Sequence, residues 1–177
     1  MFYYRVVTDM HPCEPVAVDF VDTARFRYAN SVDLAITPEQ LFEVLEDADA
    51  WPHWAKAITK VTWTSAPPRG VGTTRTVDMR GGLVGDEEFL LWEPPTRMAF
   101  RFNAASEKTI RAFAERYDVV RTPDGCRLTW TLALDVTGPS RFVTPLGKPV
   151  MNLTFRWFLR RLRRYTDHRF GVGRVPA

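Results

Sequence analysis

Cysteine and histidine are scarce in this chain of 177 residues, which has two of the former and three of the latter. Cys13 and Cys126 are far apart and do not have the spacing of metal ligands. No disulfide framework is implied, so we expect a reduced, cytoplasmic protein. The three histidines, His11, His53 and His168, are isolated, with no carboxylate or cysteine at metal spacing. The sequence therefore predicts no metal site.

Short catalytic and nucleotide-binding motifs are also missing. No serine lies in a G-x-S-x-G pattern, which argues against a nucleophile elbow. The glycines of V-G-T-T-R (71–75) and G-V-G-R (171–174) are too sparse for a phosphate-binding loop, so we expect no cofactor. No apolar run approaches the ~18 residues of a membrane span, and the first ten residues do not resemble a signal peptide. These absences predict a soluble protein.

The charges are unevenly distributed along the chain. Residues 1–140 carry 15 Lys+Arg and 20 Asp+Glu, whereas residues 141–177 carry nine Lys+Arg and one acid. The net charge of +3 is therefore the sum of an acidic body (−5) and a basic C-terminal segment (+8). Such a segment favours a local anionic partner or a solvated helix face. Aromatic residues, at 13%, are numerous enough to build a large core or to line an apolar cavity.

Apolar periodicity predicts strands followed by one long helix. Residues 25–36 alternate like a half-buried strand, and T-P-E-Q (37–40) has the capping box and the early proline of a helix start. Pro52 should separate this helix from a second short one. About six antiparallel strands follow between residues 58 and 134, separated by turns at Pro67–Gly70, Gly81–Gly82, Pro94–Pro95 and Pro123–Gly125. Residues 149–167 then have helical apolar spacing, so we expect an α+β protein.

Five segments, taken in order, resemble the START-like superfamily, also called SRPBCC, in its polyketide cyclase/dehydrase and lipid-transport group. They are T-P-E-Q-L-F-E-V-L-E-D, W-P-H-W, P-P-R-G-V-G-T-T-R, W-E-P-P-T-R-M-A-F-R-F and D-G-C-R-L-T-W-T. The resemblance covers residues 25–167, leaving an N-terminal extension (1–24) and a C-terminal tail (168–177). It implies a helix-grip fold: a curved antiparallel β-sheet of about six or seven strands around a long C-terminal helix, with two short helices after the first strand.

The same resemblance implies a hydrophobic cavity between the sheet and the last helix. Members bind lipids, sterols, polyketides or similar molecules, and some catalyse cyclisation or dehydration. We expect one tryptophan of W-P-H-W to fill the core and the other to border the cavity entrance. The alternative is that the helix packs directly on the sheet and leaves no cavity. The predicted ligand-binding residues are Trp51, Trp54, Phe100, Phe113, Tyr117, Trp130, Leu132, Met151, Phe155, Phe158 and Leu162.

Three polar residues are candidates for catalysis in such a cavity. Glu115 and Tyr117 share the strand face of Phe113, and an inward Glu115 would need a partner or a raised pKa. Arg75 could be that partner or could bind a ligand carboxylate. In the alternative, Glu115 and Arg75 lie in water at the rim of the sheet. His53 is a weaker candidate for a general base, and a surface position suits it better.

The basic side of the last helix is the remaining candidate site, with Arg156, Arg160, Arg163 and Arg164. These arginines could touch an anionic membrane during lipid exchange. In a second interpretation they are solvated and pair with the acidic body. Nucleic acid is not expected, because no alternation of aromatic and basic residues supports base stacking.

The leading hypothesis is a carrier or sensor of a hydrophobic small molecule. The second is a cyclase or dehydratase acting on a polyketide-like substrate through Glu115, Tyr117 and Arg75. The third is a protein-interaction module that uses the arginine face.

Overall fold

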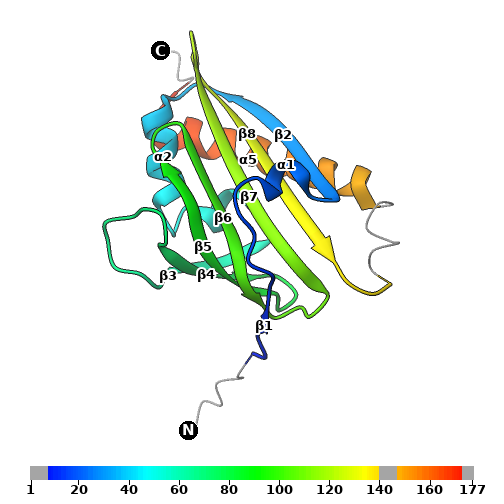
Figure 1. Cartoon of the computed structure of the whole chain (residues 1–177). Coiled ribbons are helices and arrows are strands. Elements are labelled where there is room, and N and C mark those ends of the chain that lie inside the picture. Colours follow the sequence, from blue (N-terminus) through cyan, green and yellow to red (C-terminus); the bar gives the residue numbers. More distant parts are fainter. Residues whose placement is uncertain (1–7, 140–146, 173–177) are drawn as a thin grey trace, which may run out of the picture.

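The computed structural model describes residues 8–139 and 147–172. Seven antiparallel strands form one sheet in the order β2-β8-β7-β6-β5-β4-β3, and the short strand β1 pairs with β6 (Figure 1). The strands are β1 (His11–Pro12), β2 (Phe26–Leu34), β3 (Ile58–Trp63), β4 (Thr74–Met79), β5 (Val84–Glu93), β6 (Arg97–Ala105), β7 (Ile110–Thr122) and β8 (Gly125–Val136). The helices are α1 (Phe20–Thr23), α2 (Pro38–Glu46), α3 (Trp51–Trp54) and α5 (Lys148–Phe170).

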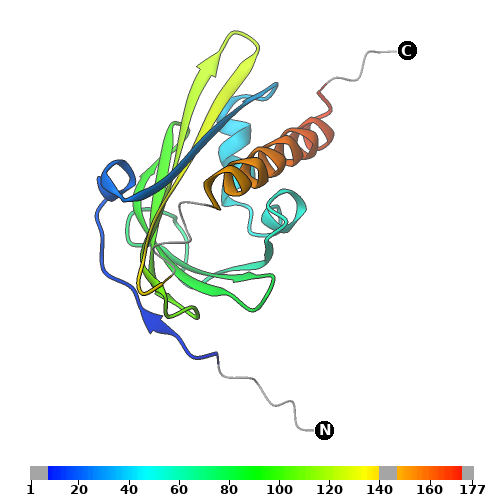
Figure 2. The same ribbon diagram turned by 90° about the vertical axis from the view of Figure 1, so that its right-hand side faces the viewer.

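The sheet is strongly curved, and α5 lies on its concave side together with α2 and α3 (Figure 2). Helix α5 packs mainly against β2 and α3. β2 pairs antiparallel with β8, so the first and last long strands of the sheet lie side by side although they are far apart in the sequence. This arrangement confirms the predicted α+β class and the helix-grip fold.

The predicted capping box starts α2. The Thr37 hydroxyl accepts a hydrogen bond from the Gln40 backbone N–H at 3.2 Å, and the Gln40 side chain accepts one from the Thr37 N–H at 3.0 Å. The chain then turns through residues 47–50 into α3, whose Trp51 indole donates to the Leu45 carbonyl at 3.0 Å. The two short helices after the first long strand are therefore confirmed, and α3 is pinned to the end of α2.

Helix α5 is longer than the expected span. It has 23 residues and ends at Gly171, which adopts the left-handed backbone conformation (φ 67°) of a typical C-terminal cap. The last turn of the helix thus includes the first residues of the segment 168–177, which was predicted to be a tail. None of the helices in residues 8–139 and 147–172 is long and apolar enough to cross a membrane.

The segment before residue 25 joins the sheet. β1 pairs with the end of β6, and two backbone bonds continue this contact: Cys13 N–H donates to the Asn103 carbonyl at 2.9 Å, and Glu14 N–H donates to the Arg111 carbonyl at 2.8 Å. Since Asn103 is on β6 and Arg111 is on β7, the segment fills the gap where these two strands diverge.

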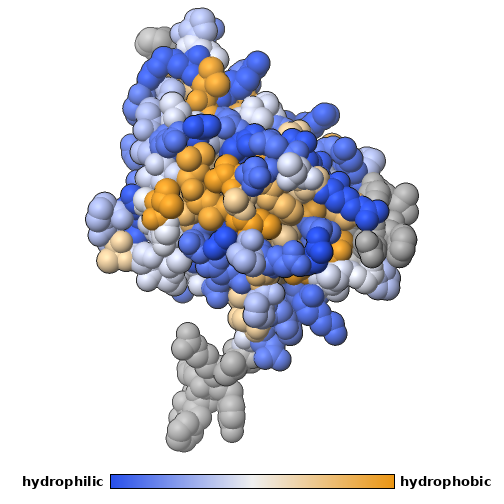
Figure 3. Space-filling view, in the orientation of Figure 1, coloured by the Kyte–Doolittle hydropathy of each residue, from blue (hydrophilic) through white to orange (hydrophobic). Residues whose placement is uncertain are grey.

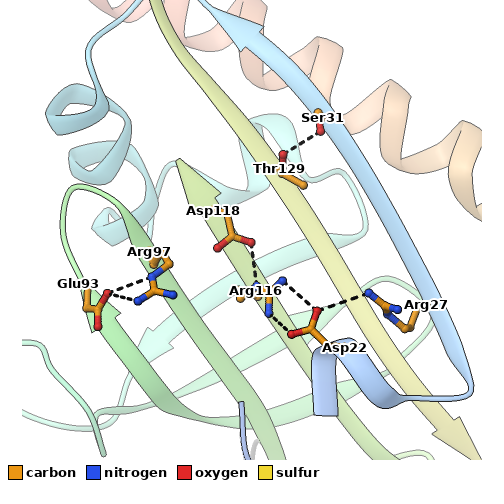
Figure 4. Close-up of polar contacts among 8 residues, drawn as sticks. All are labelled: Asp22, Arg27, Ser31, Glu93, Arg97, Arg116, Asp118 and Thr129. Carbon is orange, nitrogen blue, oxygen red and sulfur yellow. Dashed lines mark hydrogen bonds and ion pairs between the residues drawn. The ribbon is translucent and has the colours of Figure 1, made fainter. Parts of the chain in front are cut away.

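Helix α1 covers part of the convex face. Val21 is fully buried there against Ala114 and Ala133, whose small side chains leave room for the helix. The Asp22 carboxylate accepts hydrogen bonds from Arg116 at 2.7 and 3.1 Å and lies 3.5 Å from Arg27 (Figure 4). Apolar side chains gather across the middle of this face, in the region that β5, β6, β7 and α1 occupy in Figure 1 (Figure 3).

Candidate functional site

Aromatic rings fill the space between the concave face and α5. Trp130 on β8 lies at the centre, with its ring centroid 4.4 Å from Phe155 of α5, 5.5 Å from Tyr117 and 5.9 Å from Trp54. The rings of Trp51 and Trp54 are 4.9 Å apart. Strands β7 and β8, helix α3 and helix α5 thus all contribute to one aromatic cluster.

Most of the predicted ligand-binding residues lie in this core. The buried ones are Trp51, Trp54, Phe100, Tyr117, Trp130, Leu132, Phe155, Phe158 and Leu162. Phe113 and Met151 are partly buried at its edge, and Phe113 stacks on Phe102 with a centroid distance of 3.9 Å. The predicted set did not include Tyr28. This residue is buried, and its ring centroid lies 6.3 Å from that of Phe155. Its alternation with Phe26 and Val32 is the sequence signal that places it on the inner face.

Two pockets lie among the described residues, one at the edge of this interface, between β2 and the start of α5, and one away from it. One, of about 300 Å³, is lined by residues 25–28 and Lys148; the other, of about 350 Å³, lies beside the β7–β8 hairpin. The expectation that one tryptophan borders an open entrance is wrong. Trp51 and Trp54 are both buried, with 1% and 0% of their surface exposed, because α3 points both rings inward.

A charged pair is buried in the aromatic core. Arg75 on β4 and Glu87 on β5 are direct cross-strand partners, and the Arg75 Nε–H donates to Glu87 Oε2. Arg75 is 1% exposed, and its guanidinium lies 4.5 Å from the Trp51 ring centroid and 4.6 Å from that of Phe100. Aromatic faces stabilise such a cation, and this stabilisation grows when water is excluded.

A second carboxyl group lies next to this pair. Glu115 Oε2 accepts hydrogen bonds from the Tyr117 hydroxyl at 2.7 Å and from the Trp130 indole at 2.9 Å. Burial raises the pKa of Glu115 to about 8, and the nearby Glu87 charge adds to this rise against the two hydrogen bonds. This rise favours the protonated form of Glu115 near neutral pH. Burial also raises the pKa of the Tyr117 hydroxyl.

These contacts correct two sequence-based expectations. Arg75 and Glu115 do not lie in water at the rim, since both are buried. The carboxylate bound to Arg75 is Glu87, not Glu115. Glu87 was not among the predicted site residues; it lies within β5, on the same face as the buried Phe89. We call Arg75, Glu87, Glu115 and Tyr117 the buried polar centre.

Two buried donors near this centre have no hydrogen-bond partner within the described part of the chain. They are Arg75 Nη1 and Trp54 Nε1. Buried donors are nearly always paired, because leaving one unpaired costs about 1–3 kcal/mol. An oxygen atom placed beside Arg75 would satisfy its Nη1, and the protonated Glu115 could donate a further hydrogen bond.

His53 lies away from this centre. It is exposed, its ring stacks on Tyr165 with a centroid distance of 5.4 Å, and its carbonyl accepts a bond from Arg161 at 3.2 Å. The imidazole therefore faces the outside of the α3–α5 contact. No group of three or more His, Cys, Asp and Glu side chains in residues 8–139 and 147–172 is placed to hold a metal ion.

With this geometry in place, comparison with known proteins identifies the family. The family described as "Polyketide cyclase / dehydrase and lipid transport" matches residues 25–167, so the chain belongs to it. The chain is also 60% identical, over 164 residues, to "Uncharacterized protein Rv2574" of Mycobacterium tuberculosis. That match covers 93% of this chain and 98% of the relative.

Solved structures share the fold at low sequence identity. A START superfamily protein from Mycobacterium smegmatis superposes with a TM-score of 0.60 at 15% identity, covering 81% of this chain and 95% of that one. The di-domain ARO/CYC StfQ from the steffimycin biosynthetic pathway gives a TM-score of 0.65 at 13% identity, covering 82% of this chain and 52% of that one. Family and fold together are those of a START/polyketide-cyclase-like ligand-binding domain, a class that binds hydrophobic small molecules.

Proposed function

We propose that the protein binds one hydrophobic small molecule between the sheet and α5, with an oxygen-bearing end of that molecule at Arg75. The observation that carries this proposal is the unpartnered Nη1 of a buried arginine surrounded by aromatic rings. The rings suit the apolar part of a ligand, and Nη1 suits an ester, ketone, hydroxyl or carboxyl oxygen. Ligand sites commonly combine an apolar lining with a few such polar groups.

The energetics of the buried pair support this assignment. Replacing a buried ion pair with apolar side chains of similar volume is often neutral or stabilising by about 1–4 kcal/mol. As a pair, Arg75 and Glu87 therefore add little net stability compared with two apolar side chains. Charged groups in such a setting are candidates for a functional site.

The closely packed rings mean that a ligand must displace side chains to enter. We propose that α3 moves to admit it. This helix has only four residues, carries both Trp51 and Trp54, and follows the turn at residues 47–50. It lies beside α5 on the concave side of the sheet (Figure 2). A shift of α3 would remove two rings from the interior at once.

Native mass spectrometry tests this function directly. We expect the protein, purified gently or incubated with a whole-cell lipid extract, to carry one added molecule, because the proposed site has a single polar end at Arg75. The measurement is the mass of the complex and of the released compound. A clean apo mass after both treatments would contradict the proposal.

Two variants distinguish ligand binding in the interior from binding on the surface. The double variant Arg75→Met/Glu87→Leu keeps the interior filled and apolar but removes the polar end of the site, so we expect about tenfold weaker uptake. The surface variant Leu153→Glu should retain the adduct. Equal loss in both variants would indicate binding on the surface.

The second candidate function is an enzyme of the cyclase or dehydratase type. The observation that favours it is the Glu115 carboxyl, whose pKa of about 8 suits proton transfer near neutral pH. In this proposal Glu115 gives a proton to a substrate carbonyl or hydroxyl, and Tyr117 and Trp130 hold its other oxygen in place.

Turnover of a poly-β-keto thioester analogue tests the enzyme proposal. We expect Glu115→Gln to lower the rate about a hundredfold, because an amide cannot donate a proton as an acid does. Retention of ligand by this variant would show that binding is intact. An unchanged rate, or no turnover by the wild type, would leave binding as the function.

A further inference from the structure

The first half of α5 carries an apolar stripe that faces away from the core. Val150, Leu153 and Trp157 are exposed, and their helical positions fall within about 60° of one another. Leu153 is 63% exposed and Trp157 is 42% exposed. The opposite side of the same helix is buried through Phe155, Phe158 and Leu159. The helix is therefore apolar on two sides, and only one of them is covered by the sheet.

Arginines border this outward stripe. Arg156 and Arg160 lie along one side of it, and Arg164 continues the same face one turn further on. None of the three forms an ion pair within the described ranges. By contrast, Arg169 binds Glu43 and Asp47 of the acidic body, and Arg163 lies 4.0 Å from Asp167. Pairing with the body therefore accounts for Arg169 but not for the arginines beside the stripe.

We propose that this docking face, made of Val150, Leu153, Trp157, Arg156 and Arg160, binds the surface of an anionic lipid bilayer. The stripe would enter the interfacial zone, where tryptophan is favoured, while the guanidinium groups contact lipid phosphates. The nine basic residues and single acid of residues 141–177 give the charge complementarity that such a surface requires. Apolar contact and charge thus point to one partner.

The docking face lies on the same helix that forms one wall of the aromatic interior. Phe158 lines the aromatic interior, and its ring lies 5.3 Å from that of Trp157 on the outer side. A bilayer bound at Trp157 would therefore lie against the helix that forms one wall of the interior. The docking face does not depend on any ligand in that interior, so the two proposals fail independently.

Vesicle co-sedimentation tests the docking face. The probes are phosphatidylcholine vesicles with and without phosphatidylglycerol. We expect the wild type to bind the anionic vesicles at least tenfold more strongly than the neutral ones. Binding should weaken as salt rises, because salt screens the attraction between the arginines and the lipid phosphates. Leu153→Glu and Arg160→Glu should each weaken binding about tenfold.

Two variants serve as matched controls. Val120 on β7 is 63% exposed, the same fraction as Leu153, so Val120→Glu tests the loss of an equally exposed apolar side chain elsewhere. Lys108→Glu, in the exposed turn before β7, makes the same charge change as Arg160→Glu. Both controls should bind like the wild type. In addition, Trp157→Phe should keep binding but reduce the blue shift of tryptophan fluorescence on vesicles.

Three outcomes would overturn the proposal. The first is no binding to anionic vesicles. The second is equal weakening by Leu153→Glu and Val120→Glu, which would indicate non-specific adsorption. The third is a concentration-dependent dimer in solution that Leu153→Glu abolishes without vesicle binding, which would assign the face to a second copy of the chain.

Discussion

Arg75→Met is expected to destabilise the protein by about 3–5 kcal/mol at pH 7.5. Methionine fills a similar volume and suits the aromatic surroundings, so lost packing contributes little. The cost arises because Glu87, 4% exposed, would remain buried without the guanidinium that binds it. Urea unfolding followed by circular dichroism measures this loss.

The double variant Arg75→Met/Glu87→Leu is the control for this prediction. It removes both charges. We expect its free energy of unfolding to be within about 1 kcal/mol of the wild-type value, or higher than that value. The difference between the single and double variants then isolates the cost of the unpaired carboxylate. A double variant as unstable as the single one would show that the pair itself stabilises the fold.

The cost of Arg75→Met should also depend on pH. Burial raises the pKa of Glu87, and the Arg75 charge opposes this rise in the wild type. Without Arg75, Glu87 takes up a proton more readily, and a neutral carboxyl is cheaper to bury. The destabilisation should therefore shrink from pH 7.5 to pH 5. A pH-independent loss would point to packing instead of charge.

The sequence predicted the architecture well because the relevant signals are local. The capping box at Thr37 and Gln40 and the turn at Pro123–Gly125 each involve neighbouring residues, and the structure contains both. The break expected at Pro52 lies slightly earlier, at residues 47–50, and Pro52 belongs to the first turn of α3. The alternation of Leu128, Trp130 and Leu132 likewise fixes which face of β8 is buried. Periodicity then suffices to assign an α+β fold.

The candidate site was less predictable because it depends on contacts between strands. Alternation places Arg75 and Glu115 on inner faces, but it does not state which carboxylate reaches the guanidinium. That choice follows from the β4–β5 register, which sets Arg75 opposite Glu87. The inward orientation of both Trp51 and Trp54 depends in the same way on how α3 packs against α5. Glu87 itself was not predicted, because its partner is set by this register and not by any local motif.

Glu115 should make the protein less stable as the pH rises from about 4.5 to about 8. Its pKa is about 8 in the folded state, against 4.5 for an ordinary glutamate, so the folded protein holds a proton that the unfolded chain has already released. Between these values the unfolded state binds fewer protons, and the free energy of unfolding falls. A shift of this size corresponds to a loss of roughly 5 kcal/mol across the whole range.

Glu115→Gln should remove most of this pH dependence. The amide oxygen can still accept the bonds from Tyr117 and Trp130, and no charge has to be buried at high pH. Near pH 5 we expect the free energy of unfolding of the variant to be within about 1–2 kcal/mol of the wild-type value. At pH 9 the variant should be more stable than the wild type by several kcal/mol. The measurement is urea unfolding at pH 5, 7 and 9, with the exposed Glu46→Gln as the control.

The two stability series together locate the source of the pH dependence. The Glu87 charge contributes to the raised pKa of Glu115, so Arg75→Met/Glu87→Leu should lower that pKa. The free energy of unfolding of this variant should therefore fall less steeply with pH than that of the wild type. Glu115→Gln should reduce this fall more, because desolvation of Glu115 is the larger cause. If the wild-type curve is flat over pH 5–9, Glu115 is ionised and solvated, and the proposal that it transfers protons fails with it.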